Sequence, residues 1–461
     1  MKHLLLGLAL CSGMFSQAWA QRPADRERNM LMFEYVNSLH NLIKEGKIDT
    51  AVARSIILVE EYPSLLKGSL HDSRAQAFSP SLKASNHEFA SRQIQYLHAL
   101  SELNNPALDS FYFALASYTR FFQATDDEAR IAEVEKLLPQ IGPTPNHEAL
   151  TERYGLMILK DLDRINFENR TLRDSLCQRL LNSLESRIPL AGTDRTRSEH
   201  RAQHRFWLAW LYYHLSSDPQ LSLSEQDSLL SLAATYSPDA PDRQVRHAYF
   251  YHGVMLLDTP LVDFGFETKY IEFLQAQERF DEALSKLAEL TLLEPERLNQ
   301  LHELYQVMDR NASFEDYWQS QVNDFAADLP EAALLDLAGN PIDLDRYRGK
   351  WLYVDVWGTW CQPCVRELPD LQAFYQAQDS VADPVHVLTF SYRSEELEEF
   401  MQEHGYTFPV VEIDERVTKT LPISGYPTKL LITPTQKMIK IPFGVEWQSY
   451  VANYRGLPDI R

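Results

Sequence analysis

Apolar residues recur at every third or fourth position from residue 21 to about residue 320, which is typical of amphipathic helices. The segment FEYVNSLHNLIKEGKIDTAVARSIILVEEYPSLL (33–66) has this spacing and breaks at Gly46 and near Pro63. QERFDEALSKLAELTLLEPERLNQLHELYQVM (277–308) repeats it, with Pro295 between two helices. Both segments resemble tetratricopeptide-like helix pairs. Because we find no constant period between them, we predict an irregular helical repeat or bundle over residues 21–324.

The most aromatic stretch of this helical part is RFWLAWLYYHL (205–215). It could line a peptide-binding groove or form a core helix of the stack. An apolar stripe at helical spacing usually faces a core, so the core interpretation is favoured.

The pattern changes near Phe325. Gly339-Asn340 predicts a hairpin within residues 333–344. Runs rich in branched and aromatic residues then predict buried strands, and helical spacing separates them. The expected strands are 351–357, 384–392, 426–434 and 437–443, and the expected helices are 361–378 and 394–405, the second with Ser394 as N-cap and Gly405 at its end. Alternating strands and helices predict an α/β domain over residues 325–461.

The first residues have the features of a secretory signal peptide. Lys2 precedes the short apolar run Leu4–Leu10, and small residues surround a cleavage point after Ala20. The run is too short for a convincing membrane anchor, and no later run reaches membrane length. Lipidation of Cys11 is disfavoured because Leu10 stands where a lipobox needs a small residue. We therefore expect an exported protein of the bacterial periplasm, with residues 1–20 removed.

Charge and cysteine content narrow the possible functions. The formal net charge is −21, which would repel a phosphate backbone, so nucleic acid is a poor candidate partner. The chain has only 4 cysteines. Cys177 lies on the apolar side of a helix and is interpreted as a small buried hydrophobe. Cys361 and Cys364 are three residues apart, and this spacing needs another explanation.

The Cys361–Cys364 pair stands where a strand is followed by a helix. Unpaired N–H groups and the helix dipole favour a thiolate at Cys361, so its pKa should fall below the ~8.5 of a free cysteine. Cys364 is one turn further and can close a disulfide. Pro363 is tolerated in a first turn. We therefore expect Cys361 to attack a partner disulfide and Cys364 to resolve the mixed disulfide.

Residues around the cysteine pair indicate the direction of electron flow and the groups that could transfer a proton. Gln362 and Pro363 carry no charge, which favours a reductant or a mild exchanger over a strong oxidant. Asp355 lies in the preceding strand, and a buried carboxyl there could take up and return the Cys364 proton. Glu367 follows Cys364 by one helical turn. Either carboxylate could instead be an ordinary solvent-facing residue.

Two other uses of such cysteines are disfavoured. A zinc site would need a second pair of ligands, and no other CxxC accompanies this one, so no metal is expected. A thiol peroxidase would need a threonine three residues before its cysteine, whereas Thr359 precedes Cys361 by two.

VDVWGTWCQPCVRELP (354–369), the preceding RGK strand and the later GYPT (425–428) resemble the thioredoxin fold. Within that fold they are similar to the exported TlpA/ResA-like thiol–disulfide oxidoreductases, over residues ~325–461. The resemblance implies that Trp357 and Trp360 pack around the first cysteine. It also implies that Asp355 corresponds to the buried aspartate of thioredoxin, and that Glu367 shapes substrate docking.

The same resemblance implies a docking surface for the substrate. Pro427 would be a cis proline that exposes the backbone before it, and the substrate-binding residues would be Trp360, Gln362, Pro363, Tyr426 and Pro427. The chain departs from the family in the hairpin LITPTQKMI, where Thr433 and Gln436 replace the usual Asp and Gly. The long helical part resembles extensions that some bacterial members carry.

These observations lead to a first hypothesis and two alternatives. The first is an enzyme that reduces or exchanges disulfides of other exported proteins, without a dissolved cofactor and with a membrane thiol relay as electron donor. The second is a helical-repeat binding protein whose thioredoxin-like domain is a docking module with little turnover. A thiol peroxidase is a lesser alternative.

Overall fold

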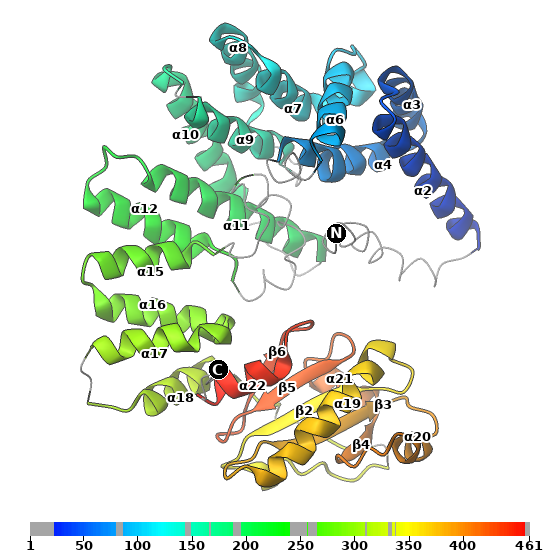
Figure 1. Ribbon diagram of the computed structural model, residues 1–461, viewed down its shortest axis with the longest axis vertical. Coiled ribbons are helices and arrows are strands. Elements are labelled where there is room, and N and C mark those ends of the chain that lie inside the picture. The colour runs from blue at the N-terminus through cyan, green and yellow to red at the C-terminus, as the bar shows by residue number, and fades with distance from the viewer. Residues whose placement is uncertain are drawn as a thin grey trace. The chain divides into compact units, whose positions relative to one another are not determined.

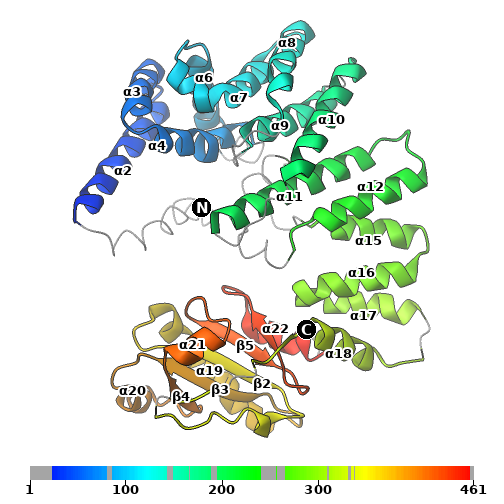
Figure 2. The ribbon, with the colours of Figure 1, turned by 180° about the vertical axis from the view of Figure 1, so that it is seen from behind.

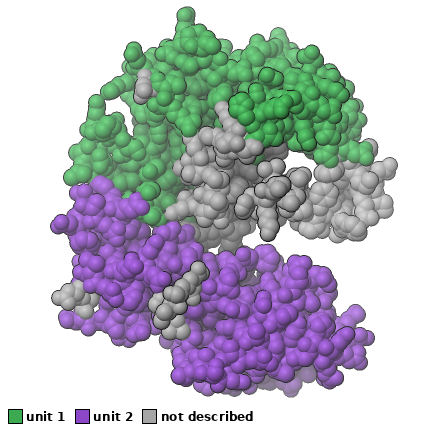
Figure 3. Space-filling view, in the orientation of Figure 1, with its two compact units in different colours: residues 1–270 green, residues 271–461 purple. Residues whose placement is uncertain are grey.

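The structure is a computed structural model that divides into two compact units, Met1–Tyr270 and Ile271–Arg461 (Figure 3). It describes residues 23–79, 86–142, 149–165, 167–187, 195–239, 256, 265–308, 311–330, 334–336 and 338–456. The expected signal peptide, residues 1–20 with Cys11, lies outside the described residues. No helix among the described residues is long and apolar enough to cross a membrane.

The first unit is built from helices, as the three- to four-residue spacing predicts (Figures 1 and 2). Helices that follow one another in the chain pack together, such as α6 with α7 and α11 with α12. Gly46 and Pro63 mark helix ends as expected. The α-helices are α2 (Pro23–Lys44), α3 (Ile48–Glu61), α4 (Pro63–Gly68), α6 (His87–Ser101), α7 (Pro106–Gln123), α8 (Asp127–Leu137), α9 (Leu150–Arg164), α10 (Arg170–Arg187), α11 (Arg195–Ser216) and α12 (Leu223–Tyr236), and α15 (Glu267–Ala276) spans the division between the units.

Two sequence features of this unit belong to its core. Phe206, Trp207 and Trp210 of α11 are buried, so the aromatic stretch forms a core helix and not an open groove. Cys177 on α10 is also buried, between Leu176 and Leu180. Burial raises the pKa of the Cys177 thiol to about 12, with a smaller opposing effect of Arg173. This cysteine therefore stays a thiol at neutral pH, as expected for a small buried hydrophobe.

A buried ion pair also lies in the core of the first unit. Glu152 on α9 is fully buried, and its Oε1 accepts hydrogen bonds from Arg187 Nη2 at 2.7 Å and from Ser183 Oγ. Its Oε2 accepts from Thr151 Oγ1 at 2.8 Å. Both carboxylate oxygens are thus hydrogen-bonded, which is what a charge in a protein core requires.

The second unit combines three helices with an α/β domain that contains a six-stranded mixed sheet of order β1-β6-β5-β2-β3-β4. The strands β2, β3 and β4 are parallel, and the other neighbours pair antiparallel. The elements are α16 (Phe280–Leu293), α17 (Leu298–Val307), α18 (Phe314–Phe325), β1 (Ala327–Asp328), β2 (Leu352–Trp357), α19 (Gln362–Ala377), β3 (His386–Tyr392), α20 (Leu397–His404), β4 (Val410–Ile413), α21 (Glu415–Thr420), β5 (Thr428–Ile432), β6 (Lys437–Ile441) and α22 (Trp447–Tyr454).

The central strand β2 is buried on both faces, as its run of branched and aromatic residues predicts. On one face Tyr353 stacks on Trp447 of α22 at 4.4 Å between ring centroids and also contacts Phe374 of α19. Val354 and Val356 point to the opposite face. Asp355 lies on the Tyr353 face and is therefore covered as well.

Helix α22 attaches α16, α17 and α18, the three helices that precede the α/β domain, to that domain. Trp318 Nε1 of α18 donates to Asn453 O at 2.9 Å, and Tyr454 OH donates to Leu292 O of α16 at 2.8 Å. The predicted domain boundary near residue 324 thus lies inside this second compact unit. That boundary marks the change from helices to the α/β part.

The structure refines two turns of this unit. The hairpin expected within 333–344 consists of one bridge, Leu335 to Pro341, and a turn in which Asn340 N donates to Asp336 Oδ1 at 2.7 Å. The β5–β6 hairpin forms without the usual Asp and Gly. Thr433 Oγ1 accepts from Lys437 N at 3.2 Å, and Gln436 adopts the left-handed φ of 61° that glycine would favour.

Candidate functional site

Cys361 and Cys364 form a disulfide at the first turn of α19, with an S–S distance of 2.05 Å and a Cα–Cα distance of 5.3 Å. Cys361 is the N-cap residue, and its Sγ accepts a hydrogen bond from Cys364 N at 3.3 Å. The helix starts here because Pro363 occupies its first turn, where no N–H partner is needed. Both cysteines are buried, whereas Gln362 between them is exposed.

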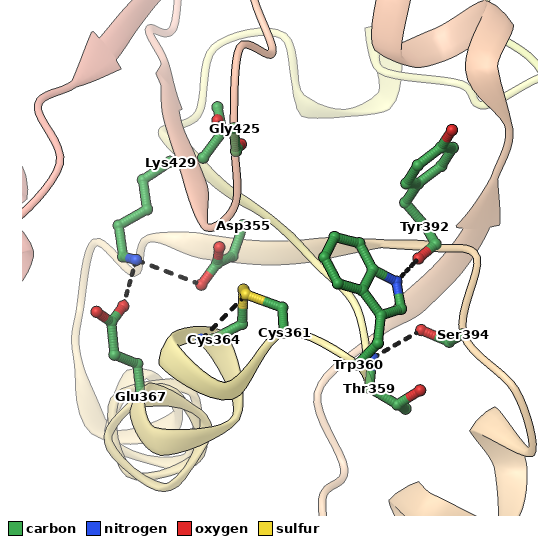
Figure 4. The surroundings of a disulfide bond; sticks show 11 residues. Asp355, Thr359, Trp360, Cys361, Cys364, Glu367, Tyr392, Ser394, Gly425 and Lys429 are labelled. Atoms are coloured by element: carbon green, nitrogen blue, oxygen red, sulfur yellow. Dashed lines mark hydrogen bonds and ion pairs between the residues drawn. A yellow bond between two sulfur atoms is a disulfide. The ribbon is translucent and has the colours of Figure 1, made fainter. Parts of the chain in front are cut away.

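Two carboxylates and one lysine lie beside this disulfide (Figure 4). Asp355 is only 3% exposed, and burial raises the pKa of its carboxyl to about 6; the Lys429 charge opposes this effect and Glu367 adds to it. Lys429 Nζ lies 3.9 Å from Asp355 Oδ2 and forms an ion pair with Glu367. Among the described residues, Asp355 Oδ1 has no hydrogen-bond partner. At neutral pH Asp355 is therefore mostly ionised and free to accept a proton.

Sequence reasoning missed Lys429. It lies in β5 directly opposite Asp355 of β2, so the two side chains emerge on the same face of the sheet. The available signal was a lysine inside the buried apolar run TKLLI, since a buried ammonium needs an anionic partner. Without the strand register, that partner could not be identified.

Aromatic rings form a rim on the other side of the cysteines. Trp360 is 51% exposed, and its Nε1 donates to Tyr392 O at 2.9 Å. The Tyr426 ring meets Trp360 edge-on at 5.1 Å and stacks on Tyr392 at 5.5 Å. A Cβ at Gly358 would lie 2.5 Å from Trp360 Nε1, so only glycine lets the indole lie so close to the backbone.

Ser394 does not cap the following helix as expected. Helix α20 begins at Leu397 with Glu396 as its N-cap residue, in a left-handed conformation. The Ser394 hydroxyl instead accepts from Thr359 N at 3.0 Å (Figure 4). It also bonds to Ser391 Oγ at 2.6 Å. Its side chain therefore holds the loop before Cys361, which is a use that helix-capping patterns do not predict. Gly405 ends α20 with a positive φ, as expected.

The structure brings most of the expected site residues together around the first turn of α19. The Asp355 carboxyl and Glu367 reach this turn from β2 and from α19 itself. Pro427 is buried at the start of β5, and its peptide bond with Tyr426 is cis. Among the described residues, no group of three or more His, Cys, Asp and Glu is placed to hold a metal ion.

These residues together provide a reversible dithiol–disulfide pair, a buried carboxyl that can exchange a proton, and an exposed aromatic edge. The helix start stabilises negative charge on the sulfur of Cys361. The chemistry that such a group can perform is thiol–disulfide exchange.

The chain is similar to known proteins over its α/β part. The AhpC/TSA family model matches residues 322–441. The thiol-disulfide oxidoreductase ResA of Bacillus subtilis is 31% identical over 132 residues, which cover 28% of this chain and 74% of that protein. ResA of Geobacillus thermodenitrificans is 32% identical over 116 residues, covering 25% and 67%. A thioredoxin family protein from Chlorobium tepidum, described as a thiol:disulfide interchange protein, aligns with 18% identity and a TM-score of 0.25 over 28% of this chain and 94% of that one.

Proposed function

Because the chain belongs to the family of ResA-like thiol–disulfide oxidoreductases, we propose that it reduces or exchanges disulfides of other exported proteins through Cys361 and Cys364. The disulfide at the first turn of α19 is the observation that carries this proposal. It holds the two sulfurs where one can attack a client and the other can release it.

The reaction proceeds in two exchanges. The Cys361 thiolate attacks one sulfur of the client disulfide, that S–S bond breaks, and the other client sulfur leaves as a thiolate and takes a proton from water. Cys364 then loses its proton to Asp355 and attacks Cys361 Sγ. This closes the protein disulfide and releases the second client thiolate, so two electrons pass from the protein to the client.

The substrate docks beside the cysteines on the aromatic rim. Trp360 and Tyr426 provide apolar contact, and the backbone before Pro427 pairs with an extended client segment. The exposed Gln362 and the partly exposed Pro363 complete this edge at the helix start. Apolar contact and backbone pairing recognise shape more than sequence, which suits an enzyme with several clients.

The protein works after export, with residues 1–20 as its signal peptide. In the periplasm it is re-reduced by a membrane thiol relay, because each turnover leaves the Cys361–Cys364 pair oxidised and no dissolved cofactor takes part. The family membership and the signal-like first residues support this placement.

Replacement of the resolving cysteine tests the proposal. A Cys364→Ser variant expressed in cells should accumulate covalent complexes that run as high-mass bands and collapse on reduction, because Cys361 attacks but nothing releases the client. A Cys361→Ser/Cys364→Ser variant is the matched control and should trap nothing. Absence of trapped proteins in the single variant would contradict the proposal.

Turnover separates this function from the alternatives. The wild-type protein should accelerate the reduction of insulin by a small thiol, whereas a passive helical-repeat binding protein should not. Consumption of hydrogen peroxide without insulin reduction would instead support a thiol peroxidase.

A further inference from the structure

A buried lysine connects the two carboxylates of the site. Lys429 and Asp355 are direct partners in the antiparallel pair of β5 and β2. Lys429 reaches between Asp355, 3.9 Å from its Oδ2, and Glu367, with which it forms an ion pair (Figure 4). The lysine side chain is only 9% exposed, so these two anions replace most of its hydration.

The two carboxylates differ in their access to water. The Glu367 side chain is 38% exposed, whereas that of Asp355 is 4% exposed. Lys429 bonds directly to the exposed carboxylate and acts on the buried one through a longer distance. Glu367 therefore competes with Asp355 for a single positive charge.

We propose that Lys429 is a positioning residue for the exchange reaction, whose ammonium, shared between Glu367 and Asp355, sets when Asp355 is ionised and able to take the Cys364 proton. This inference rests on the proposed function. The proton that Asp355 takes from Cys364 Sγ returns to water on the side of Glu367 after the client leaves.

The other groups facing Asp355 do not substitute for this lysine. Tyr353 lies on the same strand and remains a neutral phenol because burial raises its pKa. From α19 come Glu367 and the two cysteines. The β3 residue opposite Asp355 is Thr389, which does not titrate. Lys429 is thus the one cation among the groups that the described structure places around this carboxyl.

Two substitutions should shift the ionisation of Asp355 in opposite directions. Lys429→Met removes the cation and should raise the pH at which Asp355 ionises by about one unit or more. Glu367→Gln removes a competing anion and releases Lys429 toward Asp355, so it should lower that pH. If Lys429 and Glu367 only supported the fold, the two substitutions would not shift the Asp355 midpoint in opposite directions.

The measurement is made on the full-length oxidised protein and needs no activity. The Asp355 carboxyl is titrated by infrared difference spectroscopy against Asp355→Asn. Lys429→Arg should restore the midpoint to nearly the wild-type value. Lys437→Met is the control, because it removes a lysine from β6 whose neighbours are Asp328 and Asn323.

The same shifts should then appear in the pH profile of insulin reduction. At pH 6 the Lys429→Met variant should be about fivefold slower than wild type, because a one-unit shift leaves about a tenth of Asp355 ionised. Midpoints that do not move, or that move in the same direction in both variants, would overturn the inference. If the wild-type protein fails to reduce insulin, the proposed function fails, while the infrared titration still decides the role of Lys429.

Discussion

Glu152 in the first unit and Asp355 in the second are both buried carboxylates, yet their surroundings are opposite. Both oxygens of Glu152 accept hydrogen bonds, and Arg187 lies against it at 2.7 Å. Asp355 has one oxygen without a partner among the described residues, and its nearest cation lies 3.9 Å away and is bound to Glu367. Both oxygens of Glu152 are hydrogen-bonded, whereas Asp355 Oδ1 lacks such a partner in the described part of the chain.

The number of hydrogen-bond partners distinguishes a structural carboxylate from a reactive one better than burial alone does. The hydrogen-bonded carboxylate of Glu152 serves the fold, because its ion pair with Arg187 joins α9 to α10. Burial raises the pKa of the Asp355 carboxyl to about 6, and no nearby hydrogen bond or cation fully offsets this, so Asp355 can gain and lose a proton near physiological pH. The search for reactive groups in a core should therefore begin with missing hydrogen bonds.

The largest effect is expected on stability, from breaking the buried ion pair of Glu152 and Arg187. Glu152→Ala leaves Arg187 buried without its carboxylate and should lower the free energy of unfolding of the first unit by about 3–5 kcal/mol. Urea unfolding followed by circular dichroism measures this. Glu135→Ala, at an exposed position of α8, is the control and should change stability by less than about 0.5 kcal/mol. A cost as small as the control's would remove the contrast on which the comparison rests.

Replacement of the Asp355 carboxyl should have the opposite sign. The folded-state pKa of Asp355 lies above its ordinary value of 3.8, so between about pH 4 and pH 6 this carboxyl binds more protons in the native protein than in the unfolded chain. The contribution of Asp355 to stability therefore falls as the pH rises through this window and is level above it. Asp355→Asn should abolish that slope and stabilise the second unit at neutral pH by on the order of 1–3 kcal/mol.

The same variant should lose activity. Without a proton acceptor for Cys364, insulin reduction should slow by about tenfold or more. Unfolding measured across the pH range in both proteins provides the stability data. An Asp355→Asn protein that is less stable than wild type at neutral pH would show that Asp355 is satisfied after all.

The cysteines of the two units sharpen the comparison through reactivity. In the reduced protein, Cys361 should react with iodoacetamide at neutral pH about tenfold or more faster than Cys177, because the helix start favours a thiolate at Cys361 whereas burial raises the pKa of the Cys177 thiol to about 12. Mass spectrometry of timed samples gives both rates. Unfolding in urea should make the two rates equal, and a difference that persists in urea would point to sequence-local effects.

Much of the second unit could be predicted because its signals are local. The run WLYVDVW predicts a buried strand whatever it pairs with, and β2 matches it. The turn to α19 follows from Pro363 and from the cysteine spacing. The family resemblance supplied the arrangement that local patterns lack, including the positions of Asp355 and Glu367 beside the cysteines.

The missed features depend on contacts between distant segments. Lys429 meets Asp355 only through the β2–β5 register, which no local pattern encodes. Ser394 resembles an N-cap in its own segment, but its hydroxyl accepts a hydrogen bond from the backbone N–H of Thr359, which is 35 residues away. In the helical unit the pattern predicted helices and a buried aromatic stripe, while the pairing of Glu152 with Arg187 required the packed structure.

The attachment of α22 to α16 and α18 has a practical consequence for handling the oxidoreductase domain. A fragment that starts at residue 325 would lose Trp318 and Leu292 O, and so leave Asn453 O and the Tyr454 hydroxyl of the last helix without these partners. Cutting between α15 and α16, near residue 278, keeps both of these contacts and leaves the helices whole. A fusion protein that carries this catalytic domain should therefore also include α16, α17 and α18.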